Sequence, residues 1–192
     1  MIRAALALPI AAEPLTLDEG KLRANLDWTV GDPRDALMLE FISAARQQVE
    51  QDTGIAVPEQ TRDLYFDALP TGLIPWHALP PQTAPVVDVV ALSWADAAGV
   101  ITALAPADYT VTQTNDGLTI TVAAPPAEAV RWILRVVSGF DPIPPSLLHA
   151  VGLLTAHYAT VGRDATIVGT IVAATPFGYL EAVRAFALVA LP

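Results

Sequence analysis

The sequence predicts an α+β protein in which a small antiparallel β-sheet, at about residues 61–137, is inserted into a helical bundle. Two observations lead to this class. Apolar residues recur at helical spacing in three stretches, which predicts a principal helix at about 33–52, a late helix at about 144–161 and a C-terminal helix at about 177–190. Between the first two stretches, the period changes to the two-residue alternation that is typical of strands.

The N-terminal residues 1–15 form a short apolar run with a single arginine, similar to a miniature signal peptide. Pro9 interrupts this run, so we expect an arm that is flexible or binds at an interface. Thr16 and Glu19 then have the spacing of a capping box, which predicts a short helix to about Leu26.

Residues 32–57 carry the clearest helical signal in the chain. Asp32 suits the N-cap, Pro33 suits the first helical position, and Gly54 supplies a left-handed residue past the end. One face of this helix is apolar, with Leu37, Met38, Phe41, Ile42, Ala45 and Val49 at spacings of three and four. Such a face is usually part of the core of a soluble domain.

A strand is predicted from Gln60, because Leu64 and Phe66 alternate with polar residues. Five prolines follow within 69–85, which excludes a continuous helix or a central strand there. This loop could reach a neighbouring subunit, and Trp76 and His77 are its candidate contact residues. An equally good interpretation is that the aromatic ring covers the core of its own subunit.

The rest of the β region predicts a meander of hairpins. Val86–Trp94 is rich in β-branched residues, and a turn at 96–99 leads into residues 100–104. The turn Asn115-Asp116-Gly117 gives the strongest hairpin signal, and residues 130–137 close the sheet.

Pro144 and Pro145 begin the late helix, which is apolar nearly all round and must therefore be covered on several sides. Residues 162–175 suit a flexible loop or an extended segment. The C-terminal helix that follows contains only Glu181 and Arg184 as charged residues.

Composition limits the functions that this chain can have. It has 20 acidic and 10 basic residues, a net charge of −10, so the basic footprint of a classical nucleic-acid-binding protein is absent. Hydrophobic residues reach 53% and charged residues only 16%, which favours burial against other subunits, although a coding bias toward alanine and arginine is an alternative. Without cysteine, the chain has no disulfide, thiolate metal site or cysteine nucleophile.

No pattern in the sequence predicts catalysis, a metal site or a cofactor. His77, His149 and His157 are the only histidines, and the last two lie about 80° apart on one helix without a carboxylate at ligand spacing. We interpret them as buried or partner-facing. Phosphate-binding loops, nucleophile elbows and His-Glu-x-x-His motifs are all missing, so we expect the protein not to be an enzyme.

Three stretches, in this order, resemble the head-to-tail adaptor (connector) family of tailed phages, including the adaptors of gene transfer agents. They are Ala36–Val57 with Arg46, Glu50 and Thr53-Gly54 and then Gln60-Thr61, Pro80–Tyr109 with Asp96, Gly99 and Leu104, and Pro144–Arg163. The resemblance covers most of the chain. It implies a single adaptor domain over 1–192, with an N-terminal arm at 1–15, a helical part at 16–60, a β insertion at 61–140, a late helix at 141–161 and a C-terminal partner-binding segment at 162–192.

The resemblance also implies partners. We expect a ring of twelve copies between the portal protein and the stopper or tail-completion protein, through which DNA passes without sequence-specific binding. No membrane contact is expected. The acidic helices, most simply a solvated face, would in such a ring form a channel wall that repels phosphate. Assembly would occur in the bacterial cytoplasm, and the final location would be the neck of the particle.

The resemblance places portal contacts in the C-terminal segment, whose apolar residues would bury themselves in a groove of the partner: Phe177, Tyr179, Leu180, Val183, Phe186 and Leu188. This chain departs from the family here, because it ends in Ala-Leu-Val-Ala-Leu-Pro where the family commonly has a basic stop. Two alternatives remain open: another neck component, such as a stopper or tail-completion protein, or a small cytoplasmic binding module or enzyme whose last helix completes its own core.

Overall fold

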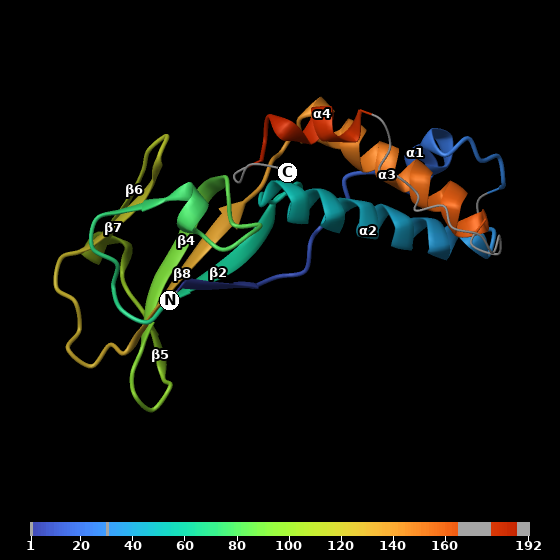
Figure 1. Cartoon of the computed structure of the whole chain (residues 1–192). Helices are drawn as coiled ribbons and strands as arrows, with labels where there is room; N and C mark the ends of the chain where they lie inside the picture. Colours follow the sequence, from blue (N-terminus) through green and yellow to red (C-terminus); the bar gives the residue numbers. More distant parts are fainter. Residues whose placement is uncertain (1, 30, 165–177, 188–192) are drawn as a thin grey trace. The chain divides into compact units, whose positions relative to one another are not determined.

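The computed structural model describes residues 2–29, 31–164 and 178–187, and it confirms the mixed α+β class (Figure 1). The chain divides into two compact units. The first, which we call the β unit, consists of residues 1–11 and 54–141, and the second, the helical unit, consists of residues 12–53 and 142–192. The β unit is not simply an insertion between helices, because it also includes the N-terminal residues 1–11.

Two antiparallel sheets form the β unit. The larger sheet has the order β1 (Ile2–Leu6), β2 (Gln60–Phe66), β8 (Arg131–Ser138), β4 (Val86–Ala95) and β5 (Ile101–Ala103). The smaller sheet has the order β3 (Leu73–Pro75), β7 (Gly117–Val122) and β6 (Tyr109–Gln113). Short 3-10 turns at Trp76–Ala78 and Pro106–Asp108 precede later strands.

The predicted N-terminal arm requires a correction, because residues 2–6 form the edge strand β1. Its register on β2 runs from Ile2 opposite Phe66 to Leu6 opposite Arg62. Backbone pairing to β2 and the packing of Ile2 and Ala4 against the core fix this segment. The strand was missed because its partner lies about sixty residues away in the sequence.

The core of the β unit lies between the inner faces of its two sheets. Buried apolar residues from both sheets meet there, among them Leu64, Phe66, Trp132 and Leu134 from the larger sheet and Leu118, Ile120 and Val122 from the smaller. The predicted hairpin at Asn115-Asp116-Gly117 is confirmed as the connection between β6 and β7. Gly117 allows β3 to approach closely, since a Cβ atom at this position would lie 2.0 Å from the Ile74 carbonyl oxygen.

The helical unit contains α1 (Leu17–Arg23), α2 (Arg34–Thr53), α3 (Pro145–Asp164) and α4 (Tyr179–Arg184). The capping box predicted at the start of α1 is present, with the Thr16 hydroxyl accepting from the Glu19 amide and the Glu19 carboxylate accepting from the Thr16 amide. The predicted principal and late helices correspond to α2 and α3. Four residues of the predicted apolar stripe on α2 are fully buried: Met38, Ile42, Ala45 and Val49.

The predicted C-terminal helix at 177–190 is shorter than expected. Its described part, α4, ends at Arg184. The amides of Phe186 and Ala187 bond to carbonyls three residues back, so the chain leaves the α-helix in a tight turn. The remaining residues of the predicted helix, 177 and 188–190, lie outside the described residues. Over the ranges that are described, no helix combines the length and apolar character needed to cross a bilayer.

Candidate partner surfaces

The proline-rich loop places its two candidate residues differently. The Trp76 indole nitrogen donates to the Asn115 carbonyl oxygen at 2.9 Å, and the ring packs half-buried against the core of the β unit. Trp76 therefore covers the core of its own subunit, which is the second of the two interpretations that the sequence allowed. The neighbouring His77 is exposed and remains a candidate contact residue.

The helix α4 has an inner and an outer face. On the inner face, Tyr179 is 1% exposed and Val183 is fully buried. The Tyr179 hydroxyl donates to Asp52 Oδ2 at 2.6 Å, and burial together with this carboxylate raises the pKa of Tyr179. On the outer face, Leu180 is 47% exposed. Phe186 lies past the end of the helix and is half-buried.

Two of the six predicted portal-contact residues, Phe177 and Leu188, lie outside the described residues. Of the other four, Tyr179 and Val183 pack inside the helical unit, so Leu180 is the large apolar side chain that this helix presents outward. The prediction of a portal contact in this segment thus stays a prediction, and among the residues that the structure describes it depends chiefly on Leu180.

Arg46 and Glu50, two residues that carried the family resemblance, form a buried ion pair on α2. Arg46 Nη1 lies 2.6 Å from Glu50 Oε2, and Arg46 Nε lies 2.8 Å from Glu13 Oε2. The Glu50 side chain is 1% exposed. Two carboxylates therefore pair with one guanidinium inside the helical unit, which explains these residues by stability rather than by contact with a partner.

A second ion pair, which the sequence analysis did not identify, joins α1 to the start of α2. Lys21 Nζ lies 2.6 Å from Asp35 Oδ1, and this oxygen also accepts from the Trp28 indole at 2.8 Å. The Arg34 guanidinium stacks 4.3 Å from the centroid of the Trp28 ring. The Lys21 ammonium, with the Trp28 indole and the Gly31 amide, holds the pKa of Asp35 below its usual range.

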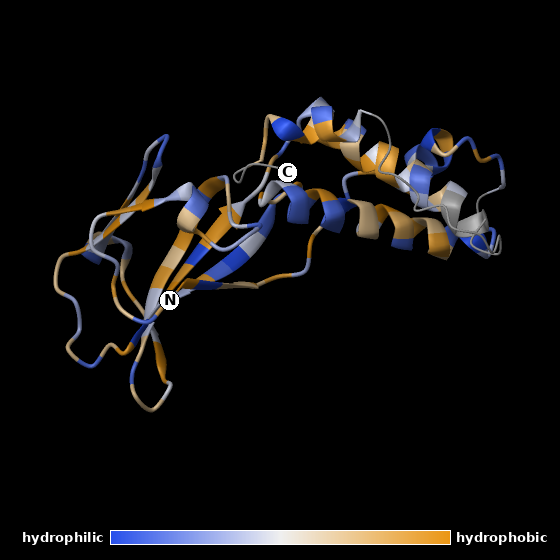
Figure 2. Cartoon of the chain, viewed as in Figure 1, coloured by the Kyte–Doolittle hydropathy of each residue, from blue (hydrophilic) through white to orange (hydrophobic). Residues whose placement is uncertain are grey.

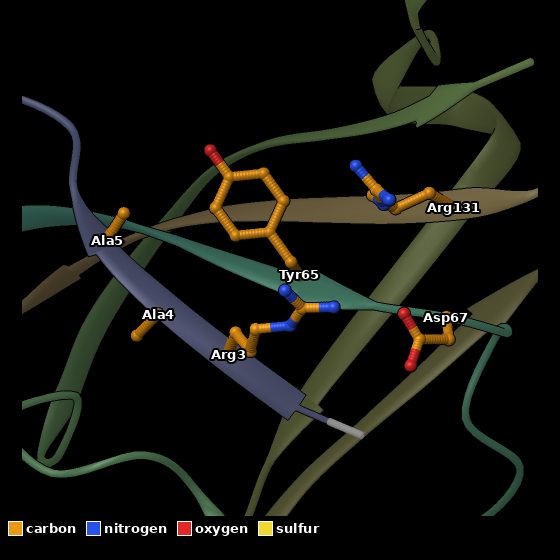
Figure 3. Close-up of a pocket in the computed structure, with 6 residues that line it drawn as sticks. All are labelled: Arg3, Ala4, Ala5, Tyr65, Asp67 and Arg131. Carbon is orange, nitrogen blue, oxygen red and sulfur yellow. The ribbon is translucent and has the colours of Figure 1, made fainter. Parts of the chain in front are cut away.

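A shallow pocket lies on the outer face of the larger sheet, opposite the core (Figure 3). Its lining comes from β1, β2, the residue that follows β2, and β8, and consists of Arg3, Ala4, Ala5, Tyr65, Asp67 and Arg131. The register of β1 on β2 sets Arg3 directly opposite Tyr65. Figure 3 shows the guanidinium groups of Arg3 and Arg131 beside the Tyr65 side chain. Sequence reasoning missed this pocket, since strand pairing alone brings these residues together.

No family model matches the chain, and no curated protein matches it significantly. Solved structures do. The neck of an empty gene transfer agent (GTA) particle computed with C6 symmetry contains a chain that aligns with a TM-score of 0.75 and 24% identity, covering 99% of this chain and 97% of that one. This chain has the fold of a gene transfer agent neck protein.

Two further structures with the neck fold agree. The neck of a native GTA particle computed with C12 symmetry aligns with a TM-score of 0.69 and 25% identity, covering 100% of this chain and 97% of that one. The virion of a native GTA particle aligns with a TM-score of 0.69 and 22% identity, covering 98% and 97%. The resemblance noted in the sequence is thus confirmed at the level of the fold. In these structures the neck fold belongs to a particle component rather than to an enzyme.

The histidines and carboxylates of this neck fold form no metal centre in the part of the chain that the structure describes. His149 is exposed, and the ring of His157 lies 6.1 Å from that of Tyr158 at a tilt of 53°. Several acidic residues of the helical unit are in ion pairs, among them Glu13, Asp32, Asp35 and Glu50. Asp18, Asp27 and Glu40 are exposed, as the prediction of a solvated face requires.

Proposed function

We propose that this chain is a structural component of the neck of a gene transfer agent or related phage-like particle. The observation that carries the proposal is the end-to-end match to a neck chain, over 99% of this chain and 97% of that one. A match of this extent includes both units of the chain, so the likeness does not rest on one common supersecondary motif. Within the neck, we assign the chain the role of head-to-tail adaptor.

The adaptor role rests on the order of sequence motifs as well as on the fold. An adaptor would bind the portal on one side and a stopper or tail-completion protein on the other. The solved necks were computed with C6 and C12 symmetry, and a ring of twelve subunits satisfies both. We therefore propose that this protein forms a homo-oligomeric ring of twelve copies.

Exposed apolar side chains support an assembly of this kind. On α1, Leu22 is 80% exposed, and on the hairpin of β4 and β5, Val100 and Ile101 are 59% and 63% exposed. In Figure 2, β5 has the hydrophobic colour. Burial of these groups against neighbouring subunits would remove apolar surface from water, which stabilises an oligomer.

The charge of the chain suits a DNA conduit. With a net charge of −10, each subunit repels phosphate, so a ring would let DNA slide through without binding a particular sequence.

The likeness to neck chains equally supports a second role in the neck, as a stopper or tail-completion protein. Binding to purified portal protein separates the two roles. An adaptor binds the portal directly, whereas a stopper binds only after the adaptor ring is in place. A third alternative is a small cytoplasmic binding module or enzyme, which the burial of Tyr179 and Val183 in their own unit would suit.

Deletion of the gene from a particle-producing strain tests the proposed function. We expect heads that carry a portal but no tail, and restoration of tails when the full chain is supplied again. Electron microscopy of purified particles gives this result directly. Normal numbers of tailed particles from the deletion strain would overturn the proposal.

A further inference from the structure

The outer face of the larger sheet has the composition of a protein interface. Pairing of β1, β2 and β8 places Arg3, Tyr65, Ile133 and Arg135 on this face, with small residues around them. Arginine and tyrosine are enriched in interfaces and in the few residues that dominate binding. Three of the nine arginines of this acidic chain, Arg3, Arg131 and Arg135, thus gather on one sheet face.

Two of these three arginines are available to a partner. Arg135 is held by Asp63, through Nε to Oδ1 at 2.7 Å and Nη2 to Oδ2 at 2.9 Å. Arg3 and Arg131 are exposed, and neither forms an ion pair with any residue that the structure describes. Since the pocket lining contains these two guanidinium groups and one carboxylate, from Asp67, it is cationic on an otherwise acidic protein.

We propose that the pocket of Arg3, Tyr65 and Arg131 binds exposed carboxylates of a second copy of this chain, and that it forms one side of the contact between neighbouring ring subunits. This inference rests on the proposed ring. A head-to-tail contact in a ring joins two different surfaces of the same chain, which must complement each other. A guanidinium recognises a carboxylate by paired hydrogen bonds, and the Tyr65 ring supplies a rigid apolar wall beside it.

The helical unit of the next copy offers the complementary surface. Asp18, Asp27 and Glu40 are exposed and lie within a short stretch of sequence around α1 and the start of α2. DNA is a poorer occupant, because the net charge of −10 repels a phosphate backbone from the whole subunit. Charge complementarity therefore favours a second copy.

A photo-cross-linking experiment tests this contact in assembled particles. Tyr65 is replaced by benzoylphenylalanine in the full chain, the variant is expressed in the producing strain, and purified particles are irradiated. We expect a covalent link between two copies of this chain, with the second peptide drawn from residues 18–40. A link to another protein, a link to DNA, or no link would each overturn the inference while leaving the proposed function intact. If the chain is missing from purified particles, the proposed function fails, and the inference fails with it.

Charge variants at Arg131 supply a second test that leaves Tyr65 unchanged. Arg131→Glu sets like charges against the neighbouring carboxylates, so we expect about a tenfold drop in tailed particles. Arg131→Lys keeps the charge and should retain most of them. Thr112→Glu, at an exposed position on β6, is the control for an added surface carboxylate and should have no effect. Equal yields from Arg131→Glu and Thr112→Glu, with both proteins folded, would overturn the inference.

Discussion

The Tyr179 hydroxyl donates a 2.6 Å hydrogen bond to the Asp52 carboxylate, which joins α4 to the end of α2 across 127 positions of sequence. This bond anchors the C-terminal segment to the helical unit. The inner face of α4 therefore stabilises its own subunit, whereas Leu180 lies on the outer face, which is exposed and can contact a partner.

Tyr179→Phe should lower the stability of the helical unit by about 1.5 to 3 kcal/mol, because it removes a part-buried hydrogen bond to a charged group. Denaturant unfolding followed by circular dichroism measures this change. Leu180→Ala, on the exposed face of the same helix, should change the free energy of unfolding by less than about 0.5 kcal/mol. Equal stability of the Tyr179→Phe protein and the unaltered protein would show that this bond does not hold α4.

Leu180→Asp should abolish portal binding and leave the subunit folded, because it places a charge on the apolar outer face of α4. Leu39→Asp is the matched control, since Leu39 on α2 has the same exposure of 47% and lies outside the C-terminal segment. Pull-down with purified portal protein compares the two. Undiminished portal binding by Leu180→Asp would place the contact elsewhere. This substitution is sharper than deletion of residues 177–192, because the deletion also removes Tyr179 and Val183 from the core.

How far the sequence predicted the fold depends on how local each signal is. The ends of α2 follow from Asp32, Pro33 and Gly54, which act within one helical turn, and the β6–β7 hairpin follows from its own turn residues. The strand β1 was missed because its pairing with β2 is a long-range relationship. The α4 helix was extended too far because its apolar pattern continues past Arg184, where the backbone turns away.

The same distinction applies to the candidate surfaces. The six apolar residues of the C-terminal segment could be recognised from sequence, but which of them face inward depends on packing against α2 and α3. The pocket of Arg3, Tyr65 and Arg131 has no sequence signal at all. Its residues lie in three strands that only the register of the sheet brings together.

Glu50→Ala should destabilise the helical unit by about 3 to 5 kcal/mol, because it leaves the buried Arg46 guanidinium without its closest partner. Arg46→Met combined with Glu50→Leu removes both charges and should cost less than the single change. Thermal and denaturant unfolding of the three proteins measure this order. A single variant as stable as the double variant would contradict a structural role for the pair.

Low pH should weaken the Lys21–Asp35 ion pair that joins α1 to α2. The pKa of Asp35 is depressed in the folded protein by Lys21, so its contribution to stability is present above the ordinary aspartate value of about 3.9 and is lost as the pH falls through the depressed pKa. Asp35→Asn should therefore be less stable than the unaltered protein at neutral pH, and the difference should shrink below about pH 4. Unfolding curves from pH 2 to 7 measure it, and a difference that stays constant with pH would contradict the ion pair.

A reconstruction of the particle neck with this subunit labelled by a fused marker domain tests the neck assignment most directly. The account predicts a ring of twelve labels between the head and the tail, with both units of the chain fitting the density of each subunit. Neck density that is fully explained by other proteins, with the labelled chain outside the particle, would contradict it.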